Sequence, residues 1–267
     1  MRNPSHFARY FGSAAVAAIL AASLGGCQTA LSPDVTGSLG VRAEAAPGQV
    51  PRDAVEAYGE RYRANPRDAN AALQYGQALR QNGQRQQAVA VLEQATIANP
   101  GNKALLAAYG RALADNGNFQ QAFDILTRAH TPANPDWRIL SVQGTTLDQM
   151  GKHEDARRYY ASALKIAPEE PSVLSNLGMS YVLSKDLPKA ESVLRRAFNR
   201  GSADSRVRQN LGLVVGLQGR FAEAETIVKA DLPAEEAEAN VAYLKHMLSR
   251  DSGRGPRTTA VAEPSRS

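Results

Sequence analysis

One cysteine and four histidines are the side chains of this chain that most readily suggest covalent, metal-binding or acid–base chemistry. Cys27 has no second cysteine with which to form a disulfide within the chain, so the usual structural role of a cysteine in an exported protein is closed to it. The thiol is therefore of interest as a site of covalent modification.

The histidines do not fall at the spacing of metal ligands or of a catalytic triad; they are His6, His130, His153 and His246. The cluster His153-Glu154-Asp155 comes nearest to a reactive group, but it lies at the expected start of a helix, where acids suit the helix dipole. The glycines recur at a fixed interval along the chain and form no phosphate-binding loop. We therefore expect no catalytic residue, metal site, cofactor or small-molecule substrate, and no enzymatic activity.

The residues before Cys27 indicate how its thiol is modified. Residues 1–26 have the basic start and the short, alanine-rich apolar stretch of a secretory signal peptide, too short and too weakly apolar to span a membrane. Leu24-Gly25-Gly26-Cys27 resembles the bacterial lipobox, whose cysteine becomes the mature N-terminus and receives a diacylglyceryl group on sulfur. The resemblance implies acylation of Cys27 and a membrane anchor. The alternative is an ordinary signal peptide with an incidental cysteine.

The resemblance also implies a location. Gln28 stands where the family's signal for retention in the inner membrane favours aspartate, so the expected site is the periplasmic face of the outer membrane. Residues 27–50, with the acylated cysteine at their start, are small, polar and interrupted by proline and glycine, which predicts a flexible tether.

Residues 51–248 are organised by a 34-residue period. Glycine recurs at Gly76, Gly110, Gly144, Gly178 and Gly212, and alanine follows each by twelve residues, from Ala88 to Ala224. This period with small residues at these two places is the signature of the tetratricopeptide (TPR) repeat, a pair of antiparallel helices. We expect the small residues to mark the closest approach of the paired helices, where a larger side chain would force them apart. The fold class predicted is an all-α TPR superhelical solenoid.

The register sets the expected boundaries. A lone second helix, 52–66, precedes the first full repeat, and a capping helix, 233–248, follows the last one, with a disordered tail at 249–267. The five repeats are expected at 69–102, 103–136, 137–170, 171–204 and 205–231.

TPR solenoids present the first helix of each repeat to a partner, and five positions of the repeat commonly make the contact. In this chain those positions are Asn70, Gln77, Arg80, Arg111, Arg138, Ser141, Thr145, Asp148, Asn176, Met179, Arg206, Gln209, Asn210 and Leu213. Asn176 and Asn210 are expected to bond a client backbone at both donor and acceptor groups. The groove lacks the lysines of the chaperone-type clamp for a C-terminal carboxylate. The alternative is that any one of these residues is only a solvated polar group or contacts the lone N-terminal helix.

The formal net charge of +5 favours solubility and acidic partners, whereas an export signal and the lack of an aromatic–basic motif argue against nucleic acid.

The closing segment Asp231-Leu232-Pro233, with Ala237, Asn240 and Leu244, is a more specific pattern than the TPR period or the lipobox. With the lipobox and about five repeats, it resembles the TadD family of tight-adherence (Tad/Flp) pilus assembly lipoproteins. The resemblance implies a non-enzymatic protein scaffold of the type IVb pilus machine that helps the secretin to assemble or localise. A TPR lipoprotein adaptor of β-barrel assembly or of peptidoglycan enzymes is the alternative.

Overall fold

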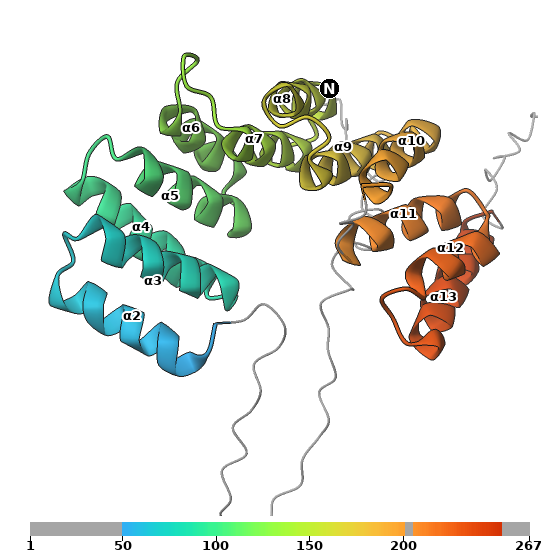
Figure 1. Ribbon diagram of the computed structural model, residues 1–267, viewed down its shortest axis with the longest axis horizontal. Coiled ribbons are helices and arrows are strands. Elements are labelled where there is room, and N and C mark those ends of the chain that lie inside the picture. The colour runs from blue at the N-terminus through green and yellow to red at the C-terminus, as the bar shows by residue number, and fades with distance from the viewer. Residues whose placement is uncertain (1–49, 201–204, 253–267) are drawn as a thin grey trace, which may run out of the picture. The chain divides into compact units, whose positions relative to one another are not determined.

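The computed structural model describes residues 50–200 and 205–252. The signal peptide, Cys27, nearly all of the expected tether and the end of the tail lie outside these residues. The described part of the chain contains twelve α-helices and no strand (Figure 1). They are α2 (Arg52–Ala64), α3 (Ala69–Gln81), α4 (Arg85–Ala98), α5 (Lys103–Asp115), α6 (Phe119–Ala129), α7 (Trp137–Gln149), α8 (His153–Ile166), α9 (Pro171–Leu183), α10 (Leu187–Phe198), α11 (Ser205–Leu217), α12 (Phe221–Val228) and α13 (Ala234–Ser252).

The helices stack as antiparallel pairs in chain order, with the first helix of each pair called A and the second B. Each of the five A helices (α3, α5, α7, α9 and α11) packs on the B helix that follows it. Successive A helices also contact one another, whereas successive B helices do not, so the A helices form the inner layer of the stack (Figure 1). The all-α TPR solenoid predicted from the period is confirmed, including a half-repeat, α2, that packs on α3.

A missing side chain sets the distance between the helices of each pair. If Gly110 carried a Cβ atom, that atom would lie 2.5 Å from Cγ of Leu126 on the paired helix, closer than van der Waals contact allows. The other four glycines of the register meet the same obstacle, at 2.5 or 2.6 Å, from Leu92, Tyr160, Leu194 and Val228. The alanines that follow the glycines by twelve residues are at most 1 % exposed. The close approach expected from the small residues is therefore present in all five pairs.

The turn inside each pair closes in one way five times. Gly83 has a φ of 73°, its N–H donates to the carbonyl of Arg80, and the N–H of Gln84 donates to the carbonyl of Leu79. This is a Schellman motif, which needs a left-handed residue and therefore favours glycine. The fourth pair makes the same bonds with Lys185, at a φ of 63°. There a lysine accepts a backbone conformation that glycine would adopt without strain.

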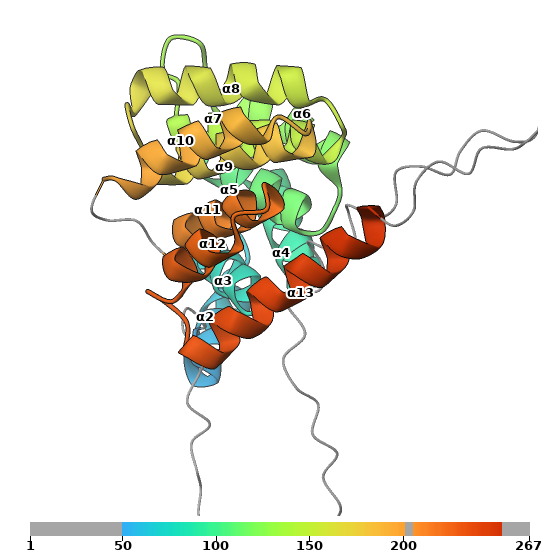
Figure 2. The same ribbon diagram turned by 90° about the vertical axis from the view of Figure 1, so that its right-hand side faces the viewer.

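The last helix covers the apolar end of the stack. α13 packs on α11 and α12 (Figure 2), with Ala237 fully buried and Val241 9 % exposed. Gly216 of α11 leaves room for Leu244, since a Cβ there would lie 2.5 Å from the leucine Cδ2. The helix runs to Ser252, four residues beyond the boundary expected at 248, so the predicted disordered tail began too early. Residues 253–267 lie outside the described part.

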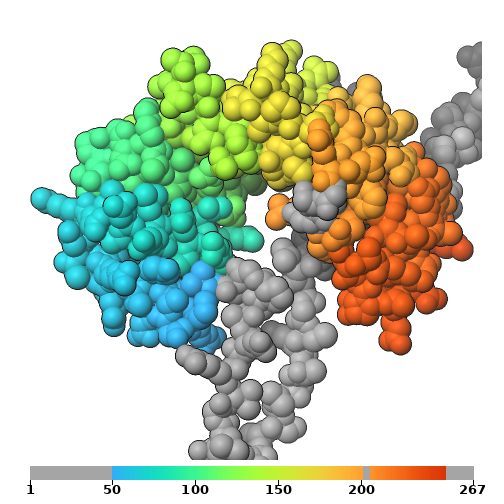
Figure 3. Space-filling model, in the orientation of Figure 1, coloured from blue at the N-terminus to red at the C-terminus, as the bar shows by residue number. Residues whose placement is uncertain are grey.

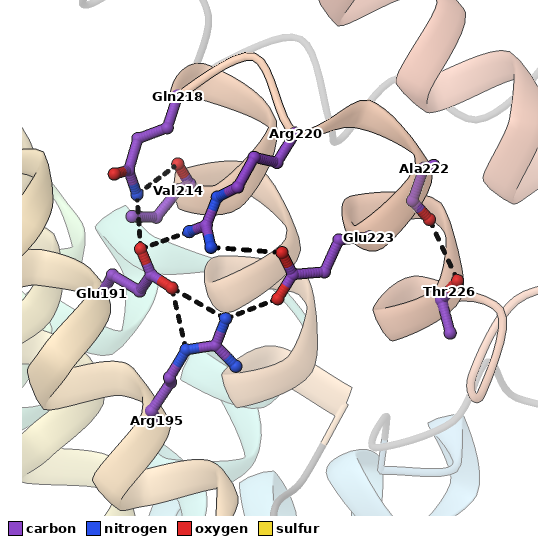
Figure 4. A network of polar contacts seen from close by, with 8 residues as sticks. All are labelled: Glu191, Arg195, Val214, Gln218, Arg220, Ala222, Glu223 and Thr226. Carbon is purple, nitrogen blue, oxygen red and sulfur yellow. Dashed lines mark hydrogen bonds and ion pairs between the residues drawn. The ribbon is translucent and has the colours of Figure 1, made fainter.

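A network of charges joins the fourth pair to the fifth (Figure 4). Glu191 of α10 accepts from Arg195 on its own helix, and from Gln218 and Arg220 in the turn between α11 and α12. Arg195 also reaches Glu223 of α12, which pairs with Arg220 as well. The Arg220 guanidinium, with the Gln218 and Arg195 hydrogen bonds, lowers the pKa of Glu191 to about 2. The carboxylate therefore stays ionised and holds the two pairs together.

The glycine contact predicts a reversal of sign between two backgrounds. Gly110→Ala should lower the free energy of unfolding by about 1–3 kcal/mol, because the new methyl group overlaps Leu126. In a Leu126→Ala background the same change should be neutral or stabilising by up to about 1 kcal/mol, because alanine is the better helix former. Urea unfolding of the four variants measures both. An equal loss in the two backgrounds would contradict the contact.

The charge network predicts a pH dependence. Because the folded-state pKa of Glu191 is depressed, its stabilisation is present above about pH 4.5 and is lost as the pH falls towards 2. Glu191→Gln should cost about 1 kcal/mol at pH 7, a figure reduced for the exposure of its partners. The difference from wild type should vanish in acid. Glu56→Gln, at an exposed carboxylate with no ion pair in the described residues, is the control, and equal profiles for both variants would count against the network.

Candidate protein-binding face

The inner layer of A helices carries the residues expected to meet a partner, and they differ in exposure. Exposed are Asn70, Gln77, Arg138, Arg206 and Gln209. Half-buried are Arg80, Arg111, Thr145, Asn176, Met179, Asn210 and Leu213, and buried are Ser141 and Asp148. The repeat register thus places most of them at the surface, but not all as free groups.

The inner layer has a hollow of about 340 Å³ between α3, α5 and α7. Figure 3 shows the surface of the stack in the orientation of Figure 1, with the first pairs in cyan and green. The hollow is lined by Arg80, Arg111, Ala114, Asp115, Phe119, Val142, Thr145, Thr146 and Gln149. It therefore brings together three of the expected groove residues: Arg80, Arg111 and Thr145.

Two arginines of the hollow have different surroundings. Arg80 binds one oxygen of Asp115 through Nε at 2.7 Å and through Nη2 at 2.6 Å, and so ties α3 to α5. Arg111 makes no hydrogen bond or ion pair with any described residue, although it is half-buried. Burial lowers the pKa of Arg111, and the nearby charge of Arg80 lowers it further. Sequence reasoning missed Asp115, which neutralises one of the two charges.

The two asparagines expected to grip a client backbone are engaged within the protein. Nδ2 of Asn176 donates to Oγ of Ser141 at 3.1 Å, and Nδ2 of Asn210 donates to Oγ of Ser175 at 2.9 Å. Each amide therefore links its A helix to the preceding one. A bond to a client backbone at both groups would need the Nδ2 donor and the Oδ1 acceptor of each amide. In the structure each Nδ2 is already partly used by its serine.

The structure contains a two-way amide grip elsewhere. Asn82, at the end of α3, donates from Nδ2 to the carbonyl of Val50 at 2.9 Å, and its Oδ1 accepts from the Val50 N–H at 2.9 Å. The bound backbone is the segment that leads into α2. Asn82 lies two residues beyond the last repeat position considered for partner contact, which is why sequence reasoning did not select it.

Asp148 is not a groove residue, contrary to expectation. Its side chain is almost fully buried, and its carboxylate accepts from Oη of Tyr160, Oγ of Ser180 and Nδ1 of His153 at 2.8–2.9 Å. The cause is Tyr160, which occupies the place of the leucine or valine of the other pairs and brings a hydroxyl into the core. That hydroxyl needs an acceptor, and Asp148 turns inward to supply it.

The cluster around Asp148 resembles a catalytic group only in composition. Ser180 is fully buried and donates to the carboxylate, not to the imidazole, so the serine has no general base to activate it. Burial, then the Asp148 charge, raises the pKa of Tyr160, which keeps its hydroxyl a donor. The cluster is suited to holding α7, α8 and α9 together.

Two other kinds of site have no candidate among the described residues. No group of three or more His, Cys, Asp or Glu side chains there could hold a metal ion. None of the helices in that part of the chain is both long and apolar enough to cross a membrane.

Comparison with known proteins agrees with the repeat geometry. Residues 149–212 match the family model described as tetratricopeptide repeat. The protein is a tetratricopeptide-repeat protein. Residues 52–129 match the model described as anaphase-promoting complex, cyclosome, subunit 3. TPR repeats are protein-interaction modules. A comparison with curated proteins finds no match.

Solved structures similar to this TPR protein share its fold at low sequence identity. PilW, described as a widely conserved type IV pilus biogenesis factor, has a TM-score of 0.63 at 18% identity, over 72% of this chain and 90% of PilW. The Cut9–Hcn1 assembly of the anaphase-promoting complex gives 0.62 at 16%, over 76% of this chain and 40% of the matched one. A thermophilic TPR protein from Thermus thermophilus gives 0.56 at 20%, over 68% of this chain and 97% of that protein.

The buried cluster of this TPR protein predicts a difference between adjacent tyrosines. Tyr160→Phe should lower the free energy of unfolding by about 1.5–3 kcal/mol, because it removes a hydrogen bond to a buried carboxylate. Tyr159→Phe is the matched control, since the Tyr159 hydroxyl has no hydrogen bond within the described residues. Chemical unfolding measures both, and a loss no larger than that of Tyr159→Phe would show that the cluster does not stabilise the fold.

Proposed function

We propose that this TPR protein is a lipid-anchored scaffold on the periplasmic face of the outer membrane that serves assembly of the Tad/Flp (type IVb) pilus. In this role it aids the assembly or localisation of the pilus secretin by holding an exposed segment of a client on its inner layer of A helices. It catalyses no reaction.

The closing segment carries the pilus assignment. Most of its pattern has a packing role: Asp231 pairs with Arg208 of α11, Leu232 packs in the last core cluster, and Ala237 is fully buried. Asn240 is different, because it is exposed on α13 and makes no described hydrogen bond. A cap of any TPR stack would need the packing residues but not this asparagine. Its match to the TadD pattern therefore favours a shared function over a shared packing solution.

Two further observations support the proposal. PilW, whose described role is in type IV pilus biogenesis, has the same fold over most of its length. The lipobox at Leu24–Cys27, outside the described residues, would confine the protein to a membrane surface. Confinement raises the effective concentration of the inner layer near an outer-membrane client, so that a weak segment interaction is sufficient.

The same fold and anchor suit one other role, that of an adaptor for β-barrel assembly or for peptidoglycan enzymes. The closing segment is the feature that favours the pilus over this alternative, and the partners captured in cells separate the two.

The test combines the anchor with the partners. Cys27→Ser should abolish palmitate labelling, whereas Gln28→Asp should keep the label and move the protein to the inner membrane. After crosslinking in cells, wild-type protein purified from detergent-solubilised envelopes should bring down the secretin or other pilus-assembly components. Both variants should lose them, because both remove the protein from the outer membrane.

Several outcomes would count against the proposal. Unchanged labelling of Cys27→Ser would remove the lipid anchor. Recovery of barrel-assembly or cell-wall proteins in place of pilus components would retain the anchored TPR protein and reject its pilus role.

A further inference from the structure

We propose that the hollow between α3, α5 and α7 binds an acidic side chain of a partner protein, and that Arg111 recognises its carboxylate. This inference deepens the proposed function and rests on its protein-binding part alone, since any client segment of this chemistry would fit.

Arg111 has hydrogen-bond donors and no acceptor for them among the described residues. A guanidinium carries five N–H donors, and those of Arg111 meet no acceptor among the described residues. Leaving a half-buried charge unpaired is costly, and a carboxylate is the group whose geometry matches the planar fork of arginine. The lowered pKa of Arg111 has the same cause, because burial disfavours its charge.

The charges around Arg111 do not balance. The charged groups near it are Arg80, Asp115, Asp136 and Arg138. Asp115 is held by Arg80, and Oδ1 of Asp136 accepts from the backbone N–H of Arg138 at the start of α7. With Arg111, these are three cations and two acids, so the surroundings of the hollow carry a positive surplus. An anionic occupant would balance it.

The walls of the hollow favour a protein side chain over a small free anion. Ala114, Phe119 and Val142 contribute apolar surface beside the guanidinium. A small inorganic anion would leave that surface uncovered. The methylene groups of a glutamate, or an apolar residue next to an acid, would cover it, and a hollow of about 340 Å³ has room for such a pair.

The experiment uses the full-length protein in detergent micelles and synthetic peptides of about twelve residues. Each peptide is acetylated and amidated, so that no terminal carboxylate is present, and carries Glu, Gln or Lys beside Leu, Ile, Val or Phe at its centre. Fluorescence anisotropy should show Glu peptides binding about tenfold more tightly than their Gln counterparts. The preference should weaken at about 0.5 M salt.

Variants assign the preference to Arg111. Arg111→Gln should bind Glu peptides about tenfold more weakly and abolish the preference over Gln. Arg128→Gln is the control with the same change of charge, at an exposed arginine of the B helix α6. Arg111→Lys should retain part of the preference, because it keeps the charge and loses the fork. The unfolding temperature of Arg111→Gln should not fall, because Arg111 makes no described bond to lose.

The outcomes separate this inference from the pilus role. Equal affinity of wild-type protein for Glu and Gln peptides overturns the inference and needs no variant to do so. An equal effect of Arg111→Gln and Arg128→Gln also overturns it, since it would reflect net charge alone. Capture of pilus components in cells is scored independently, so either idea can fail while the other stands.

Discussion

The fold depends on a contact that only glycine permits. At the eighth position of each repeat the A helix presents bare backbone, and the side chain at the twenty-fourth position of the same repeat rests on it, as Leu126 does on Gly110. This contact sets the separation of the two helices, and the buried alanines Ala122 and Ala129 are small enough to fit that separation. Because the contact recurs in all five pairs, the separation of each A helix from its B helix is set in the same way along the stack.

The third pair shows how a change in the core reaches that face. Tyr160 fills the place of leucine over Gly144, and its hydroxyl donates to Asp148, which is buried. In this buried position Asp148 also accepts a hydrogen bond from Ser180 of the next pair. A groove position is thereby converted into a buried link between repeats. In the second pair Arg111 has no such link and stays available. The chemistry of the inner layer thus varies along the stack because the core beneath it varies.

The period predicted the fold class, since packing requires a small residue at the same place in every pair. The register put Arg80, Arg111 and Thr145 among the expected partner-contact positions, and the structure brings these three to one hollow. It could not tell which polar side chains were free, because partners such as Asp115 for Arg80 come from the neighbouring repeat. The burial of Asp148 could have been predicted from Tyr160, because a tyrosine hydroxyl in the core requires a hydrogen-bond acceptor. The exact end of α13 depended on local helix propensity beyond the last apolar residue.

The amide grip of Asn82 on Val50 has a mechanical consequence. A pull on the chain ahead of Val50 meets these two hydrogen bonds before it can act on α2. The load then enters at the end of α3, a helix packed between α2, α4 and α5, and is shared by the first full repeat. Without the grip, the same force would act first on the lone half-repeat, which is held by its packing on α3 and by the hydrogen bond from Tyr62 to Gln94 of α4. One asparagine thus protects the terminal half-repeat from a pull on the chain that precedes it.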